Sequence, residues 1–267
     1  MLHESLLDDA RAIAGDIVAL RRAIHAEPEL GLQTPLTRDK VRAALADLPL
    51  DWRESTSTSG LVATLKGGAG PGRTVLLRGD MDALPLTEDT GLDFTSKNVG
   101  AMHACGHDTH VAMLAGAARA LCAKRDQLAG TVMFMFQPGE EGHHGCRFML
   151  EDGLIDPLPD AAFAIHITPS MPSGTFASKP GTLMASSDKL RIRVIGRGGH
   201  ASMPHDALDP IPIACEIVTA LQTAMTRRIG VVDPAVVTIA RIEGGTTDNI
   251  IPEDCRLWGT LRTLSER

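Results

Sequence analysis

Residues 101–110, AMHACGHDTH, contain three histidines, one cysteine and one aspartate. Polar side chains at this density cost free energy to bury unless a partner or an ion satisfies them. The stretch is therefore consistent with a metal site, with a thiol nucleophile beside its base, or with a solvated loop. Cys105 and His107 can both turn toward one ion from an irregular loop, while Asp108 is placed to cap the helix that follows.

Three further polar stretches follow predicted strands or precede predicted helices. They are RGDMDALP (78–85), FQPGEEG (136–142) and FAIHI (163–167). Because functional groups of α/β sheets gather at the carboxyl ends of the strands, we expect these stretches and the first one to converge on one point.

The adjacent pair Glu140 and Glu141 favours metal-assisted hydrolysis. Neighbouring side chains project in different directions, so one carboxylate can bind a metal while the other faces a water molecule as a general base. His166 adds an imidazole, and this inventory of ligands suits Zn²⁺ or Mn²⁺ better than Ca²⁺ or Mg²⁺. A thiol nucleophile at Cys105 would leave the two glutamates and His166 unexplained.

The elements that must position these residues alternate between helix and strand. Amphipathic spacing predicts a surface helix over 4–26, and short apolar runs predict strands. The remaining expected elements are strands at 61–67, 74–80, 130–137 and 160–167 and helices at 108–125 and 145–154. The runs 130–137 and 160–167 are continuously apolar, which is typical of strands buried on both faces. This alternation predicts an α/β domain with a mostly parallel sheet.

The pattern changes near residue 184, where we place the start of a second, α+β domain. Its expected elements are strands at 188–198, 235–245 and 253–263 and a helix at 209–228. The first of these strands alternates in polarity, which indicates one solvated face.

The bulk composition narrows the class of protein. The 267 residues are 43% hydrophobic with a net charge of −7 and no run of Lys and Arg, so we expect no nucleic-acid partner. No apolar run reaches the roughly 18–20 residues of a membrane span. The N-terminus starts acidic, unlike a signal peptide, so we expect a cytoplasmic protein. The five cysteines are odd in number and irregularly spaced, which favours reduced thiols.

Six motifs in order along the chain resemble the M20 metallopeptidase family. They are LRRAIHAEPELG, RGDMDALP, MHACGHDTH, FQPGEEG, AIH and GRGGHASMPHDALDP. The sequence is most similar to the amidohydrolase branch, which includes hippurate hydrolases, N-acyl-amino-acid deacylases and auxin-conjugate hydrolases. The resemblance implies a catalytic α/β domain, here 1–183, that binds two divalent ions, Mn²⁺ or Zn²⁺. It also implies a smaller lid and dimerisation domain, here 184–267, and hence a homodimer.

The resemblance also implies roles for individual residues. The metal ligands are expected to be Cys105, as a bridging ligand, with His107, Glu141 and His166. Three residues are expected to act in catalysis: Glu140 as general base, Asp82 as the acid that orients a ligand, and His200 as a stabiliser of the developing oxyanion. Asn249 resembles a substrate contact of the lid domain.

The implied reaction is hydrolysis of the amide bond of an N-acyl amino acid by metal-activated water. A dipeptidase or carboxypeptidase of the same family is the alternative, and an inactive truncated fragment is another. Family members continue well beyond the position of Arg267 and return to the catalytic domain with a last metal-ligand histidine. The resemblance therefore implies that both domains are incomplete here and that this chain binds metal more weakly than a longer version. For His103 and His110 we expect supporting roles beside the metals or roles at the start of the helix, and for His143 and His144 solvent-facing ones.

Overall fold

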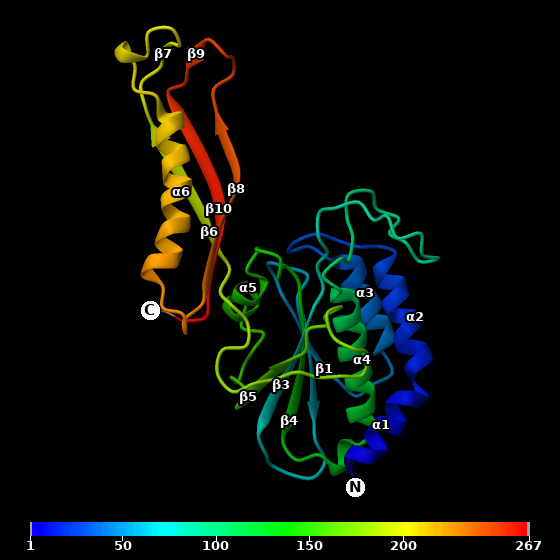
Figure 1. Cartoon of the computed structure of the whole chain (residues 1–267). Coiled ribbons are helices and arrows are strands. Elements are labelled where there is room, and N and C mark those ends of the chain that lie inside the picture. The colour runs from blue at the N-terminus through cyan, green and yellow to red at the C-terminus, as the bar shows by residue number, and fades with distance from the viewer. Residues whose placement is uncertain (1, 266–267) are drawn as a thin grey trace. The chain divides into compact units, whose positions relative to one another are not determined.

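The computed structural model describes residues 2–265. It contains two compact units, Met1–Met171 and Pro172–Arg267, which are considered one at a time (Figure 1). Residues 172–187 form no helix or strand, so the change in strand pattern near residue 184 falls shortly before the first strand of the second unit.

The first unit begins with helices that pack beside one another. They are α1 (Leu2–Ala12), α2 (Ala14–His25) and α3 (Pro35–Ala44). The single helix predicted over 4–26 is thus two helices, because the backbone leaves helical geometry at Ile13. Further along the chain are α4 (His107–Ala123), the 3₁₀ turn η1 (Arg125–Gln127) and α5 (Gly145–Glu151).

A five-stranded sheet forms the centre of this unit, in the order β1-β2-β4-β3-β5. Its strands are β1 (Asp51–Glu54), β2 (Leu61–Lys66), β3 (Thr74–Asp80), β4 (Thr131–Gln137) and β5 (Ala161–Ala164). β3 is parallel to both β4 and β5, whereas β1 pairs antiparallel with β2 and β2 antiparallel with β4. The sheet is therefore mixed, and the expectation of a mostly parallel sheet is correct only for β4, β3 and β5. The short loop at 55–60 explains the β1–β2 pairing, because a short connection can join only antiparallel neighbours.

Helices cover both faces of the sheet, as Figure 1 shows. On one face α2, α3 and α4 bury Ile24, Val41 and Val111 against Phe134 and Phe136. On the other face Met149 of α5 packs with a second group of buried side chains, Val62, Leu76, Met133, Met135, Leu154 and Ile155. Because β4 carries Phe134 and Phe136 on one face and Met133 and Met135 on the other, its prediction as a doubly buried strand is confirmed.

The strand β5 differs from its prediction. It pairs with β3 alone among the described residues, and all four of its residues are exposed. Phe163 is 59% exposed. The apolar run was expected to be buried on both faces, but at the edge of a sheet a strand has a neighbour on one side only, so its composition does not determine its burial.

The second unit is built on a three-stranded antiparallel sheet in the order β6-β10-β8, with α6 lying along it (Figure 1). Its main elements are β6 (Asp188–Ile195), α6 (Pro210–Arg228), β8 (Ala235–Gly244) and β10 (Asp254–Thr263). The short elements β7 (Gly199–His200), η2 (Pro204–Asp206) and β9 (Ile250–Ile251) complete it. Ala214 of α6 is buried against Val194, Cys255 and Leu257 of the sheet. Asp209 caps α6 by accepting a hydrogen bond from the Ile211 N–H at 2.9 Å.

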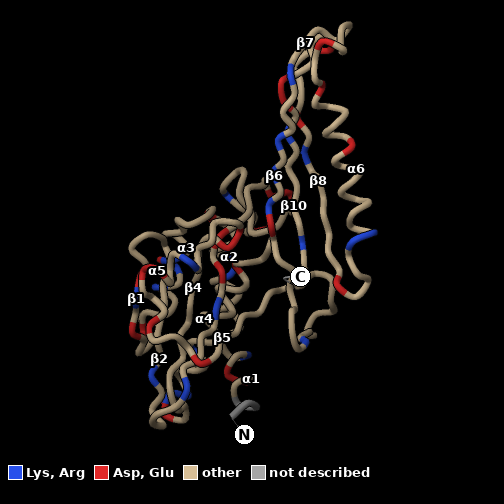
Figure 2. Tube along the Cα trace, turned by 90° about the vertical axis from the view of Figure 1, so that its left-hand side faces the viewer, with Lys and Arg blue, Asp and Glu red and all other residues tan. Residues whose placement is uncertain are grey.

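Acidic and basic side chains are interspersed along both units rather than segregated by sign (Figure 2). Among the described helices, none has both the length and the apolar character needed to cross a membrane.

Candidate metal centre

Four segments of the first unit meet at the carboxyl ends of its parallel strands. β3 ends at Asp80 and leads directly to Asp82, and β4 ends at Gln137 shortly before Glu140 and Glu141. The chain leaving β5 carries His166, and α4 begins at His107. Because β3, β4 and β5 are parallel, their carboxyl ends lie at one edge of the sheet, where α/β proteins place their sites.

His107 lies at the centre of this cluster, which we call the His107 cluster: Asp80, Asp82, Cys105, His107, His110, Glu140, Glu141 and His166. The His107 side chain is fully buried. Its Nδ1–H donates to the Asp82 carbonyl oxygen at 2.8 Å. Its Nε2 has no hydrogen-bond partner among the described residues. Three carboxylate oxygens surround that nitrogen beyond hydrogen-bond distance, from Asp80 at 3.6 Å, Glu141 at 3.8 Å and Glu140 at 3.9 Å.

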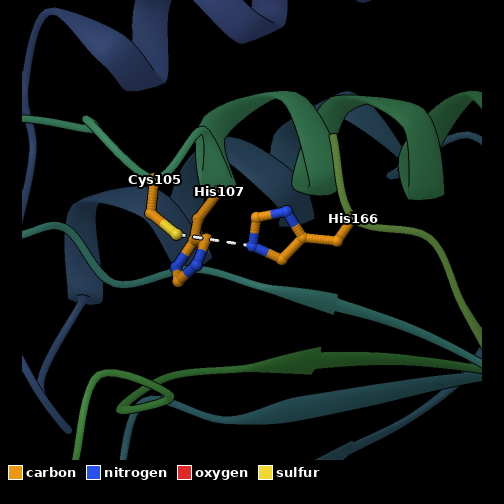
Figure 3. Close-up of side chains that lie close together, drawn as sticks. All are labelled: Cys105, His107 and His166. Atoms are coloured by element: carbon orange, nitrogen blue, oxygen red, sulfur yellow. Dashed lines mark hydrogen bonds between the residues drawn. The ribbon is translucent and has the colours of Figure 1, made fainter. Parts of the chain in front are cut away.

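Cys105 and His166 approach each other beside His107, as Figure 3 shows. The Cys105 Sγ lies 3.4 Å from His166 Nε2. The ligand atoms of Cys105, His107 and His166 all lie within 4.8 Å of one another, and so do those of His107, Glu140 and Glu141. The structure thus brings together the four residues expected to hold metal, together with the expected general base.

Asp82 holds the two glutamates in place through their backbone. Its Oδ1 accepts from the Glu140 N–H at 2.9 Å and its Oδ2 accepts from the Glu141 N–H at 3.0 Å. Its carbonyl also fixes the tautomer of His107, so one fully buried residue supports both sides of the cluster. Burial would raise the pKa of Asp82, but the hydrogen bonds from His107 and the two backbone amides outweigh it and lower that pKa.

The remaining electrostatics reflect several acids sharing one site. Burial and the negative charge of Glu141 and Asp80 raise the pKa of Glu140, which brings this carboxylate closer to the range useful for a general base. Burial, a hydrogen bond to Glu141 and the nearby carboxylates raise the pKa of the Cys105 thiol to about 12. For His107, burial lowers the pKa but is outweighed by Asp82 and the other carboxylates, so the net shift is upward.

These residues fit divalent metal ions. His107 Nε2 is buried near carboxylates and has no hydrogen-bond partner among the described residues. Burying such a polar atom costs free energy unless a partner, such as a metal ion, satisfies it. Thiolate, imidazole and carboxylate groups are the donors that divalent transition-metal ions take from proteins.

Sequence reasoning predicted only a general supporting role for His110 and left the role of Asp80 open. Both are buried, and His110 Nδ1 lies 2.5 Å from Asp80 Oδ1. Burial raises the pKa of Asp80, but His110, Arg78 and His107 outweigh it and lower that pKa to about 2. The only sequence clue to a role for Asp80 was its position at the end of a predicted strand. Its partners come from distant segments of the chain, so the sequence could not identify them.

The other histidines for which the sequence predicted roles in the first unit, His103, His143 and His144, lie outside the cluster. His103 is buried with neither ring nitrogen hydrogen-bonded among the described residues, and burial lowers its pKa to about 4. His143 and His144 are exposed.

His200 and Asn249 belong to the second unit, so their expected roles in the site stay predictions. Within that unit they lie on neighbouring segments. His200 pairs with Ile250 in the β7–β9 ladder, and the Asn249 carbonyl accepts from the Ala201 N–H at 3.1 Å.

The contacts of Asp82 lead to a testable prediction. In Asp82→Asn the amide offers one acceptor oxygen, and its NH₂ group faces one of the two backbone N–H donors. We expect the Glu140–Glu141 turn to loosen and metal affinity to fall by about 10–100-fold, as is typical when a partner of metal ligands is lost. The measurement is competition for Zn²⁺ with a chromophoric chelator.

Asp152→Asn is the matched control, because Asp152 also accepts backbone N–H bonds, from Thr56 at 3.0 Å and Ser57 at 3.1 Å, outside the His107 cluster. This control should lose stability and keep its metal affinity. Equal metal affinity in the two variants would contradict the supporting role of Asp82.

Comparison with known proteins identifies the family. Residues 76–252 match the Peptidase family M20/M25/M40. The chain is 44% identical over 267 residues to thermostable carboxypeptidase 1 of Saccharolobus solfataricus, covering 99% of this chain and 68% of that protein. It is 40% identical over 251 residues to the N-acetylcysteine deacetylase of Bacillus subtilis, covering 94% of this chain and 66% of that protein.

A solved structure agrees with this match. The crystal structure of a dinuclear metal-binding M20 peptidase from Bacillus subtilis superposes with a TM-score of 0.79 at 37% identity, covering 96% of this chain and 66% of that one. The fold and the matched residues define a hydrolase that acts on amide or peptide bonds. The chain belongs to Peptidase family M20/M25/M40 and spans about two thirds of the length of these relatives.

Proposed function

We propose that this protein is a metal-dependent amidohydrolase that cleaves the amide bond of N-acyl amino acids. The observation that carries the proposal is the His107 cluster, in which a thiol, imidazoles and carboxylates surround a buried, unpartnered His107 Nε2. Relatives that are N-acetyl-amino-acid deacetylases support the substrate class.

Cys105, His107, Glu141 and His166 would hold two divalent ions, Zn²⁺ or Mn²⁺. A relative of known structure that is named as dinuclear supports this number. Such ions supply Lewis acidity and make water more acidic near neutral pH.

Glu140 acts as the general base in this proposal. Its side chain is 41% exposed, so water and substrate can reach it, and it lies beside the cluster, 3.9 Å from His107 Nε2. It takes a proton from the attacking water and delivers it to the leaving amine, so that a carboxylic acid and a free amino acid are released. Asp82 keeps the Glu140 backbone in place during both transfers.

The remaining proposed roles fall to residues of the second unit. We assign His200 the stabilisation of the developing oxyanion and Asn249 a contact to the substrate, and we assign this unit the contacts of a homodimer. These roles follow from the family motifs GGHAS and DNIIPE in which the two residues stand.

Carboxypeptidase action on short peptides is the second candidate, because a relative at 44% identity is a carboxypeptidase. The two activities differ in the group on the acyl side of the scissile bond. An N-acyl amino acid carries no α-amine there, whereas a dipeptide carries a charged one.

The deciding experiment is an assay of hippurate, N-acetyl amino acids and the matching dipeptides with Zn²⁺ or Mn²⁺. We expect the N-acyl compounds to have the higher kcat/KM and a chelator to abolish turnover. Preferential cleavage of the dipeptides would select the peptidase candidate. Hydrolysis that persists after complete metal removal would refute both.

A further inference from the structure

His110 is a buried histidine of α4, one helical turn after His107, with both ring nitrogens engaged. Its Nε2 accepts a hydrogen bond from the backbone N–H of Ile167 at 3.0 Å. Because a backbone amide can only donate, Nε2 must be unprotonated, and the ring proton lies on Nδ1. That proton faces Asp80 Oδ1 at 2.5 Å, so Asp80 selects the tautomer that can hold Ile167.

The hydrogen bond from Ile167 to His110 holds a segment that lies beyond the end of the sheet. The β3–β5 ladder ends at Ala164, two residues before His166, and the residues that follow are exposed. The His110 ring also packs against the His166 ring, with centroids 4.6 Å apart at 70°. His110 thus contacts the His166 ring in a T-shaped arrangement and accepts a hydrogen bond from the next peptide group.

The other side of this segment packs against the loop that carries Cys105. A Cβ added at Gly106 would lie 2.3 Å from Ile167 Cδ1, so the Ile167 side chain fills the space that a larger residue would need. Gly106 also has φ +85°, a conformation that glycine adopts without strain. Ile167 is therefore held at two points: its backbone N–H donates to His110, and its side chain packs against Gly106.

Asp80, His107 and His110 also bring their ligand atoms within 4.8 Å of one another, which raises the alternative that His110 is itself a ligand. Two observations argue against this. Both of its ring nitrogens already have partners, and Asp80 Oδ2 lies 2.6 Å from the cationic Arg78 Nη1, which would oppose a further positive ion.

We propose that His110 is a positioning residue that sets His166 through the Ile167 peptide N–H, with Asp80 fixing the tautomer of His110. The inference rests on the proposed role of His166 as a metal ligand. A segment at the edge of a sheet is mobile unless other contacts hold it. If such a segment carries a metal ligand, the segment must become ordered when the metal binds, and this cost lowers the affinity for the metal. His110 removes that cost by ordering the segment beforehand.

A pair of substitutions separates the two bonds of His110. In His110→Gln the side-chain oxygen can reach the position of Nε2 and still accept from Ile167. In His110→Asn the amide can replace Nδ1–H toward Asp80, but nothing accepts from Ile167. We expect Zn²⁺ affinity, measured by chelator competition, to fall about 10–100-fold in the Asn variant and to stay within a few-fold of wild type in the Gln variant.

Hydrogen exchange in the metal-free protein gives a readout that does not depend on metal or turnover. The Ile167 amide should be protected in the wild-type protein and in His110→Gln and should exchange faster in His110→Asn. The nitrogen shifts of wild-type His110 should report the Nδ1–H tautomer, which needs no variant to fold.

Failure of the inference and failure of the proposed function give different results. Wild-type protein that binds neither Zn²⁺ nor Mn²⁺ would refute the function. Equal Zn²⁺ affinity in the Gln and Asn variants, an unprotected Ile167 amide in wild type, or an Nε2–H tautomer would each overturn the role of His110.

Discussion

Replacing Glu140 by Gln is expected to abolish turnover while leaving metal binding nearly intact. The amide has the shape of the carboxylate but cannot accept the proton of the attacking water. Loss of a general base typically costs about 10²–10⁴-fold in rate, and more if the base also positions the water. The side chain is 41% exposed, so the substitution leaves no buried group without a partner.

The measurements for Glu140→Gln are kcat on an N-acyl amino acid and bound metal per chain after dialysis. Glu151→Gln is the control, because Glu151 is an exposed residue of α5 that pairs only with Arg147 among the contacts described, at 2.7 Å. A near-normal kcat would rule out the assigned role. Loss of metal together with turnover would instead make Glu140 a ligand.

Cys105→Ser is expected to have the largest effect on metal content. A serine hydroxyl is a far weaker ligand than a thiolate, and its shorter bonds do not reach as far toward His166 as the Cys105 Sγ, which lies 3.4 Å from that imidazole. If Cys105 bridges two ions, both sites are weakened by one substitution. We expect affinity to fall by more than the roughly 100-fold that marks loss of a supporting partner.

Cys146→Ser is the matched control, since Cys146 is an exposed free thiol of α5 outside the His107 cluster. Metal content and thermal stability are measured for both variants in Zn²⁺ and in Mn²⁺. A metal content in Cys105→Ser equal to that of the wild-type protein would contradict the ligand assignment and favour the interpretation of Cys105 as a thiol nucleophile.

Much of the local structure could be predicted from sequence. β3 was expected at 74–80 and is found at Thr74–Asp80, and the helix expected at 108–125 is α4, His107–Ala123. These elements are strongly periodic or uniformly apolar, so short-range patterning is enough to define them. The members of the His107 cluster named beforehand lie at the ends of such elements, which is why their convergence could be anticipated.

Partners from distant segments could not be predicted. The pairing of Asp80 with His110 and the bond from His110 to Ile167 join β3, α4 and the chain after β5. Each of these polar residues has several chemically suitable partners in the sequence, and only the packing of the sheet selects one. The antiparallel pairing of β2 with β4 has the same origin, because pairing depends on which strand is adjacent and not on the composition of either.

The sequence by itself determined the chemistry of this protein: a thiol, imidazoles and paired carboxylates placed at the ends of strands and at a helix start. The tertiary structure decided how those groups are held. In the folded structure β5 is exposed at the edge of the sheet despite its apolar sequence. The burial of a strand depends on which elements pack against it, and the sequence of the strand itself does not determine this. The tertiary structure also placed a buried, unpartnered His107 Nε2 among three carboxylates, because residues far apart in the chain share one edge of the sheet only after that sheet has formed.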